Sequence, residues 1–169
     1  MDTKGTYRTV QGDVTDPQFS SSNEIAIIPH CCNDVGAMGA GVAKAISFKW
    51  GGVQLYYLKS GHRLGENSWV NVNTEINNII VVNMVAQNGL IRFSNPKPLK
   101  YLELIKCMTA VVDDIIKTLH MKPEYAGKKP VIHCPKFGSA LAGGNWEFIK
   151  ELIDEIWLEE GIDVVVYEF

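Results

Sequence analysis

The stretch from Pro29 to Ala43 constrains the fold most, because three glycines in it join a short apolar run to a helical pattern. The apolar run at 25–28 is typical of a buried strand, and 42–48 is typical of the first turns of a helix. Glycines let the backbone approach a ligand closely, and a helix start offers free N–H groups to an anion. The stretch predicts a phosphate-binding crevice. The alternative is a turn that only connects strand and helix.

A second stretch has the same organisation. Residues 131–135 predict a short strand, 136–144 form another glycine-rich loop, and Asn145 is a good N-cap for the last helix. Two such loops can face each other and hold a diphosphate from both sides. Neither contains a Walker A sequence or the GxGxxG spacing of a dinucleotide fold.

Strand and helix patterns alternate along the chain. Further strands are predicted at 7–11, 69–73, 79–84 and 163–167, with a hairpin between the middle two. Helices are predicted at 53–58, 100–120 and after Asn145, the last with a buried face of Trp146, Ile149, Ile153, Ile156 and Trp157. This order predicts one α/β domain over residues 1–169, with three α/β/α layers and a mixed, mostly parallel sheet.

Composition excludes several classes of partner. A formal net charge of −3 provides no electrostatic footprint for nucleic acid. The four cysteines form no CxxC pair and no zinc-spaced cluster with histidine, so we expect free thiols, no metal and no cofactor. The sequence also has no signal-like N-terminus and no stretch near the ~20 apolar residues of a membrane span. We therefore expect an intracellular, cytoplasmic protein with no membrane partner.

Taken together, the motifs resemble the macro domain family, which binds ADP-ribose. The resemblance covers nearly the whole chain and is carried by 12–14, Asn33, 39–43, 83–87, 137–141, Trp146 and 166–169. It is closest to the branch that contains ADP-ribose 1″-phosphate phosphatases, phage-encoded relatives and the terminal ADP-ribose protein glycohydrolase. If the chain is phage-encoded, it would act in the host cytoplasm.

The resemblance implies roles for particular residues. Asp13 would accept a hydrogen bond from the adenine amino group, the Val14 backbone would support the ring, and Asn33 would hold the distal ribose. Phe169 would lie against the adenine, or it is a plain core residue. Further substrate-binding residues are expected at Met38, Gly39, Ala40, Gly41, Val42, Gln87, Phe137, Gly138, Ser139, Ala140 and Leu141.

The candidate catalytic residue is His30. The phosphatase members carry a histidine just ahead of the Cys-Asn pair, and His30 stands there, at the predicted end of its strand. Histidine titrates near neutrality and can act as an acid or base. The alternative is a buried structural histidine. Ser139 has no recognisable base beside it, which favours a phosphate contact over a nucleophile.

Two classes of function stay open at this point. One is a hydrolase of ADP-ribose 1″-phosphate, with ADP-ribosyl esters on modified proteins as further substrates. The other is a non-catalytic module that binds ADP-ribose or a related nucleotide. Glycohydrolase members use a lysine and an aspartate, where this chain has Gln87 and then Ala142 or Gly143. This departure argues against the lysine-based route.

Overall fold

The computed structural model describes residues 3–168, and its centre is a mixed six-stranded sheet. The strand order is β1-β6-β5-β2-β4-β3, and within the described residues β3 alone runs antiparallel to its neighbour. The strands are β1 (Tyr7–Gln11), β2 (Glu24–Asn33), β3 (Asn67–Asn71), β4 (Asn78–Gln87), β5 (Lys129–Cys134) and β6 (Val164–Glu168). The predicted hairpin is confirmed and is formed by β3 and β4.

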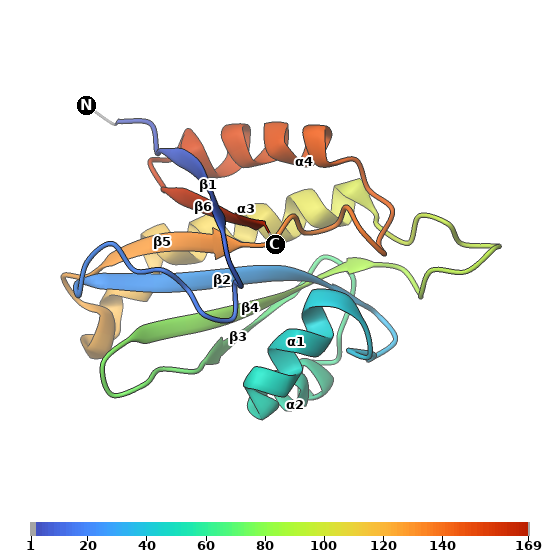
Figure 1. Ribbon diagram of the computed structural model, residues 1–169, viewed down its shortest axis with the longest axis horizontal. Helices are drawn as coiled ribbons and strands as arrows, with labels where there is room; N and C mark the ends of the chain where they lie inside the picture. The colour runs from blue at the N-terminus through green and yellow to red at the C-terminus, as the bar shows by residue number, and fades with distance from the viewer. Residues whose placement is uncertain (1–2, 169) are drawn as a thin grey trace.

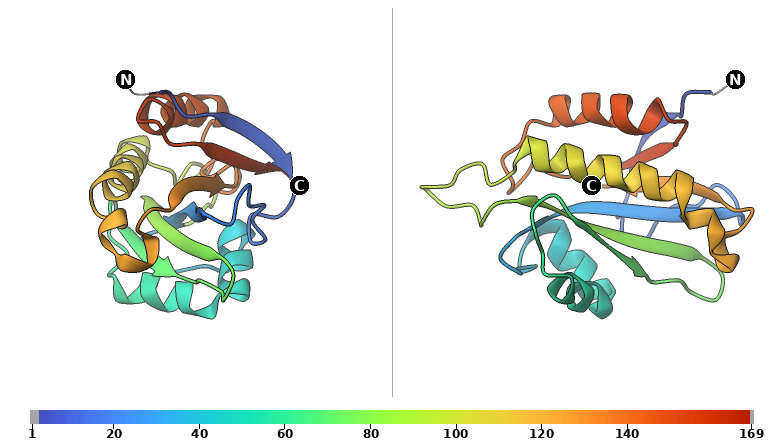
Figure 2. Two further views of the ribbon diagram at one scale, coloured as in Figure 1. Left: turned by 90° about the vertical axis from the view of Figure 1, so that its left-hand side faces the viewer. Right: turned by 180° about the vertical axis from the view of Figure 1, so that it is seen from behind.

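Helices cover both faces of the sheet (Figures 1 and 2). One face carries α1 (Gly41–Lys49) and α2 (Gly51–Lys59), and the other carries α3 (Tyr101–Lys117) and α4 (Trp146–Leu152). Two 3₁₀ turns, η1 (Leu119–Met121) and η2 (Pro123–Tyr125), follow α3. The predicted three-layer α/β/α arrangement is confirmed. No helix in the described part of the chain is long and apolar enough to cross a membrane.

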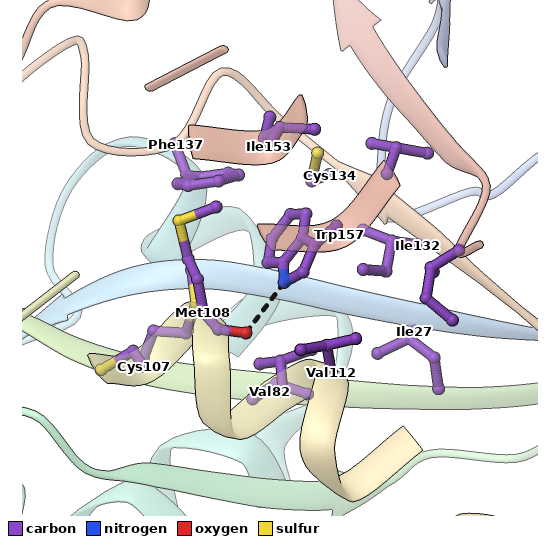
Figure 3. Close-up of a cluster of buried hydrophobic side chains, with 14 of the residues drawn as sticks. Ile27, Val82, Cys107, Met108, Val112, Ile132, Cys134, Phe137, Ile153 and Trp157 are labelled. Atoms are coloured by element: carbon purple, nitrogen blue, oxygen red, sulfur yellow. Dashed lines mark hydrogen bonds between the residues drawn. The ribbon is translucent and has the colours of Figure 1, made fainter. Parts of the chain in front are cut away.

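The core on the α3 and α4 side is built around Trp157 (Figure 3). After α4 the backbone continues as a π-helical segment, η3 (Ile153–Leu158), which carries the indole toward α3. There the Trp157 N–H donates to the Met108 carbonyl at 2.9 Å. Asn145 caps the helix as predicted, by accepting the Phe148 N–H at 3.1 Å. Of the predicted buried face, Ile149, Ile153 and Trp157 are fully buried, and Trp146 and Ile156 pack partly buried against the same core.

Strand β2 creates the opening that positions the candidate site. Its side chains alternate between the two cores, so both faces are covered, as its apolar run predicts. It pairs with β4 up to Asn33, but with β5 only over 24–27. The carboxyl-terminal half of β2 therefore has an open edge. From this opening the chain continues from β2 to β4 on one side of the sheet and from β5 to β6 on the other. Open α/β sheets bind ligands at the carboxyl ends of two neighbouring strands whose connections run in opposite directions.

Candidate functional site

A cavity of about 350 Å³ lies between the carboxyl ends of β2 and β5. The loops that follow β2, β4 and β5 gather at this end of the sheet (Figure 1) and form its walls. It brings together these predicted site residues: His30, Asn33, Gly39, Ala40, Gly41, Val42, Gln87, Phe137, Gly138, Ala140 and Leu141. Glycine loops far apart in the sequence thus share one cavity, as the sequence predicts.

The start of α1 is the part of the cavity best suited to an anion. Ala40 at the N-cap makes no side-chain cap, and the first turn holds no acidic residue. The first N–H groups of the helix are therefore free of side-chain partners, at the positive end of its dipole. Gly41 has φ of 59°, and a Cβ built on Gly39 would meet no heavy atom within 4 Å. The backbone here is open to a ligand.

The second glycine loop has a different local reason for its glycine. Gly138 has φ of 75°, and a Cβ there would lie 3.1 Å from side-chain atoms of both Leu99 and Ile149. A larger residue would be strained and would push into the core. Phe137 is buried beside it and meets Trp146 edge to face, with centroids 5.9 Å apart. The loop is therefore anchored by core packing while its open side lines the cavity.

Asn33 ends β2 as predicted, and its side chain shapes the loop that follows. Oδ1 accepts the backbone N–H groups of Val35 and Ala37, both at 3.1 Å, and Nδ2 donates to the Ala37 carbonyl at 2.8 Å. The Tyr57 hydroxyl, from α2, donates to the Asn33 carbonyl and accepts the Gly36 N–H at 3.1 Å. The Nδ2 group of Asn33 makes one hydrogen bond within the described residues, so its second proton has no partner there. Tyr57 was missed, because a buried helical tyrosine has no sequence signal for this role.

His30 lines the cavity, but the predicted end of its strand is wrong. Strand β2 continues three residues beyond it, so the side chain lies inside the sheet and is 2% exposed. Its Nε2 is 2.6 Å from Asn83 Oδ1, and Asn83 Nδ2 donates to the Ser68 hydroxyl at 3.0 Å. Burial lowers the pKa of His30 to about 4, while the Asn83 bond opposes that shift. The imidazole is neutral at pH 7 and donates to Asn83, which favours the structural alternative over an acid or base.

Other predicted residues lie outside the cavity walls. Met38 and Val14 are buried in the core on the α1 and α2 side, because each is an apolar side chain beneath a loop. Ser139 turns its hydroxyl to the Lys136 carbonyl at 2.7 Å, which closes its own loop. Phe169 lies outside the described residues.

Asp13 also lies outside the cavity walls, but at the same end of the sheet. It is exposed just after β1, and the Gly12 N–H donates to the Glu168 carbonyl at the end of β6 at 2.8 Å. Its Oδ1 accepts both the N–H and the hydroxyl of Thr15, at 2.9 and 2.8 Å. A ligand reaching Asp13 must extend from the cavity past β5 and β6.

Lys136 is a candidate that sequence reasoning missed. It lines the cavity directly after β5, and its Nζ pairs with Glu168 Oε1 at 2.8 Å. It therefore stands on the path between the cavity and Asp13, where an ammonium group can meet a phosphate. Its only signal was its place at the start of a glycine loop. No group of three or more His, Cys, Asp or Glu suited to a metal occurs among residues 3–168.

A series of buried, hydrogen-bonded side chains holds the segment that carries Asp13. Tyr167 accepts the Gln18 N–H at 2.8 Å and contacts His133 Nδ1 at 2.7 Å. The other His133 nitrogen lies 2.5 Å from a Glu24 carboxylate oxygen. Tyr167, His133 and Glu24 are each at most 5% exposed. The 12–23 segment is thus tied to the sheet through paired buried groups.

We expect Tyr167→Phe to lower the free energy of unfolding by about 1–3 kcal/mol, because it leaves the Gln18 N–H and His133 Nδ1 without a partner. Urea unfolding followed by circular dichroism measures this change. The matched control is Tyr56→Phe, since Tyr56 is half exposed. Equal stability of the two variants would show that the buried chain contributes nothing.

Comparison with known proteins identifies the fold family. No model of a protein family matches this chain, and no curated protein matches it. A protein of unknown function from Bacteroides thetaiotaomicron has a solved structure that is 28% identical, with a TM-score of 0.78 over 98% of this chain and 99% of that one. The macrodomain protein of Streptomyces coelicolor is 26% identical, with a TM-score of 0.68 over 97% and 98%.

A third solved structure, DarTG of Thermosipho africanus in complex with ADP-ribose, is 15% identical, with a TM-score of 0.71. It matches over 99% of this chain and 43% of that longer one. These similarities run along nearly the whole sequence and agree with the α/β architecture. The chain therefore has the macro domain fold.

Proposed function

We propose that this chain binds ADP-ribose in the cavity between β2 and β5. The observation that carries the proposal is the uncapped start of α1 at Gly41, which lines a cavity of about 350 Å³ together with Gly39 and Ala40. Backbone donors and a helix dipole bind a diphosphate without a basic cluster, which suits a chain of net charge −3. That DarTG of the same fold was solved with ADP-ribose supports the choice of ligand.

In this proposal the ligand spans the carboxyl edge of the sheet. The diphosphate lies between the loop at 39–42 and the loop at 137–141, with Lys136 beside it. The distal ribose lies toward Asn33 and Gln87, which line the cavity on the β2 and β4 side. The adenine extends past β6 toward the exposed Asp13, next to the buried Val14.

We expect Asp13→Ala to weaken ADP-ribose binding on the order of tenfold, because a hydrogen bond to a charged group contributes about 1.5–3 kcal/mol. Titration calorimetry measures the affinity. Asp16→Ala is the matched control, since Asp16 is an exposed aspartate in the same segment. An unchanged affinity in Asp13→Ala would remove Asp13 from the proposed site.

A second candidate is hydrolysis of ADP-ribose 1″-phosphate to ADP-ribose and phosphate. The same N–H groups of α1 that bind a diphosphate can stabilise charge on a reacting phosphoryl group. We propose that water attacks the phosphorus with backbone donors as the main stabilisers, because the buried His30, with its pKa lowered to about 4, is a weak base. Without a strong base we expect this reaction to be slow. If no reaction occurs, the chain is a non-catalytic binding module.

One experiment separates these candidates. The protein is incubated with ADP-ribose 1″-phosphate and, separately, with ADP-ribose, and phosphate release and binding heat are measured independently. Phosphate release that is lost in Gly39→Glu supports the hydrolase. Binding heat with both ligands and no release supports the binding module. No heat with either ligand would refute both.

A further inference from the structure

Charged residues follow one another along the carboxyl edge of the sheet where β5, β6 and β1 end. The register between β5 and β6, continued two residues beyond Cys134, places Lys136 level with Glu168, the last residue of β6. On the other side of β6, Glu168 pairs with Gln11, the last residue of β1, and Asp13 follows two residues later. Glu168 therefore lies between Lys136 and Asp13 along this edge.

An ion pair holds the Glu168 carboxylate at the wall of the proposed ADP-ribose cavity. Its Oε1 lies 2.8 Å from the Nζ of Lys136, which lines that cavity. The Lys136 and Glu168 side chains are 44% and 36% exposed, so a ligand can reach both. The ion pair uses Oε1, and a carboxylate has a second oxygen that can accept a further hydrogen bond.

The strand order determines which part of ADP-ribose meets Glu168 if the ligand lies as proposed above. Neighbouring strands are about 4.8 Å apart, so the end of β1 lies roughly 12 Å from the gap between β2 and β5. The diphosphate is proposed to lie at that gap, and the adenine is proposed to lie near Asp13. The part of the ligand between them is the adenosine ribose. It therefore crosses the end of β6, where Glu168 lies.

A carboxylate beside this ribose selects the chemical state of its hydroxyl groups. A free hydroxyl can donate a hydrogen bond to Glu168. A phosphate on that hydroxyl removes the proton and adds a charge of about −1.5 to −2 next to the carboxylate. Dinucleotide-binding folds use the same chemistry, since an acidic side chain accepts the ribose 2′-hydroxyl and an arginine accommodates a 2′-phosphate.

We propose that Glu168 restricts the site to ADP-ribose with a free adenosine 2′-hydroxyl and excludes 2′-phospho-ADP-ribose. This inference rests on the proposed function and adds the class of ligand to it. Lys136 takes part in the selection, because its ammonium group is paired with Glu168 and so attracts an added phosphate weakly. Without the Glu168 charge, the same ammonium group would be available to a 2′-phosphate.

Titration calorimetry with ADP-ribose and with 2′-phospho-ADP-ribose tests this inference. We expect the wild type to bind ADP-ribose at least about tenfold more tightly, because the added phosphate meets a charge of the same sign. Glu168→Gln keeps the size of the side chain and removes its charge, so the ratio of the two affinities should approach one. Glu159→Gln is the matched control, since Glu159 is a half-exposed glutamate that pairs with Lys4 and precedes β6. Its ratio should equal that of the wild type.

Two results would overturn the inference and leave the proposed function in place. The first is a wild-type affinity for 2′-phospho-ADP-ribose that equals or exceeds the affinity for ADP-ribose, a comparison that needs no variant. The second is the same ratio of affinities in Glu168→Gln and Glu159→Gln. Binding of neither ligand would refute the proposed function together with this inference. Because the Glu168 side chain is partly exposed at a strand end, Glu168→Gln is expected to fold.

Discussion

Gly39→Glu is expected to reduce ADP-ribose binding by at least about 100-fold, the largest effect of any single change at the cavity. The new carboxylate would occupy the space where the diphosphate is proposed to lie, and like charges in contact cost several kcal/mol. A Cβ at this position would meet no heavy atom within 4 Å, and the backbone is not in the left-handed region. The protein should therefore fold normally. Titration calorimetry and thermal melting measure the two effects.

Two controls make this result specific. Gly39→Ala adds a methyl group without charge and should retain most of the affinity. Gly51→Glu places the same carboxylate at another open glycine, at the start of α2, and should bind normally. Gly138→Glu is unsuitable, because its side chain would enter the packing of Leu99 and Ile149. Normal affinity in Gly39→Glu would mean that the loop is only a connector.

His30→Ala is expected to lower the free energy of unfolding by about 3 kcal/mol while leaving ADP-ribose affinity unchanged. The substitution leaves a buried cavity and removes the partner of Asn83 Oδ1. Urea unfolding tests the stability, with the exposed His120→Ala as control. A stable His30→Ala protein that has lost phosphate release would contradict this account and restore His30 as an acid or base.

The titration of His30 also makes stability depend on pH. Its pKa is lowered by burial from 6.5 to about 4, so the unfolded chain binds the proton more tightly than the folded one. The free energy of unfolding therefore has its full value, as far as His30 is concerned, above pH 6.5. It decreases as the pH falls from 6.5 toward 4, by at most about 1.4 kcal/mol per pH unit. The stability difference between the wild type and His30→Gln should narrow over this range. An unchanged difference would mean that His30 stays exposed to solvent.

Much of the fold follows from local sequence patterns. The apolar run at 25–28, the helical spacing of α3 and the Asn145 cap each act over a few residues, so each could be recognised without the rest of the chain. The hairpin followed from two strand patterns separated by turn residues. The facing of the two glycine loops was also predictable, because parallel strands place their carboxyl ends at one edge.

The errors concern contacts that depend on distant residues. The end of β2 was predicted three residues too early, at His30, because β2 continues to Asn33 through its pairing with β4, a strand far along the chain. Tyr57 and Lys136 were missed because their roles depend on which loops meet in space.

The most direct test of the central claim is an amide NMR titration of the ¹⁵N-labelled protein with ADP-ribose. Binding between β2 and β5 predicts saturable shifts of the amides of Gly39, Gly41 and Gly138, which line that cavity. The amides at the distant β3–β4 turn, residues 72–77, should not move. Saturable binding that leaves these three glycine amides unmoved, or no binding at all, would contradict the proposed site.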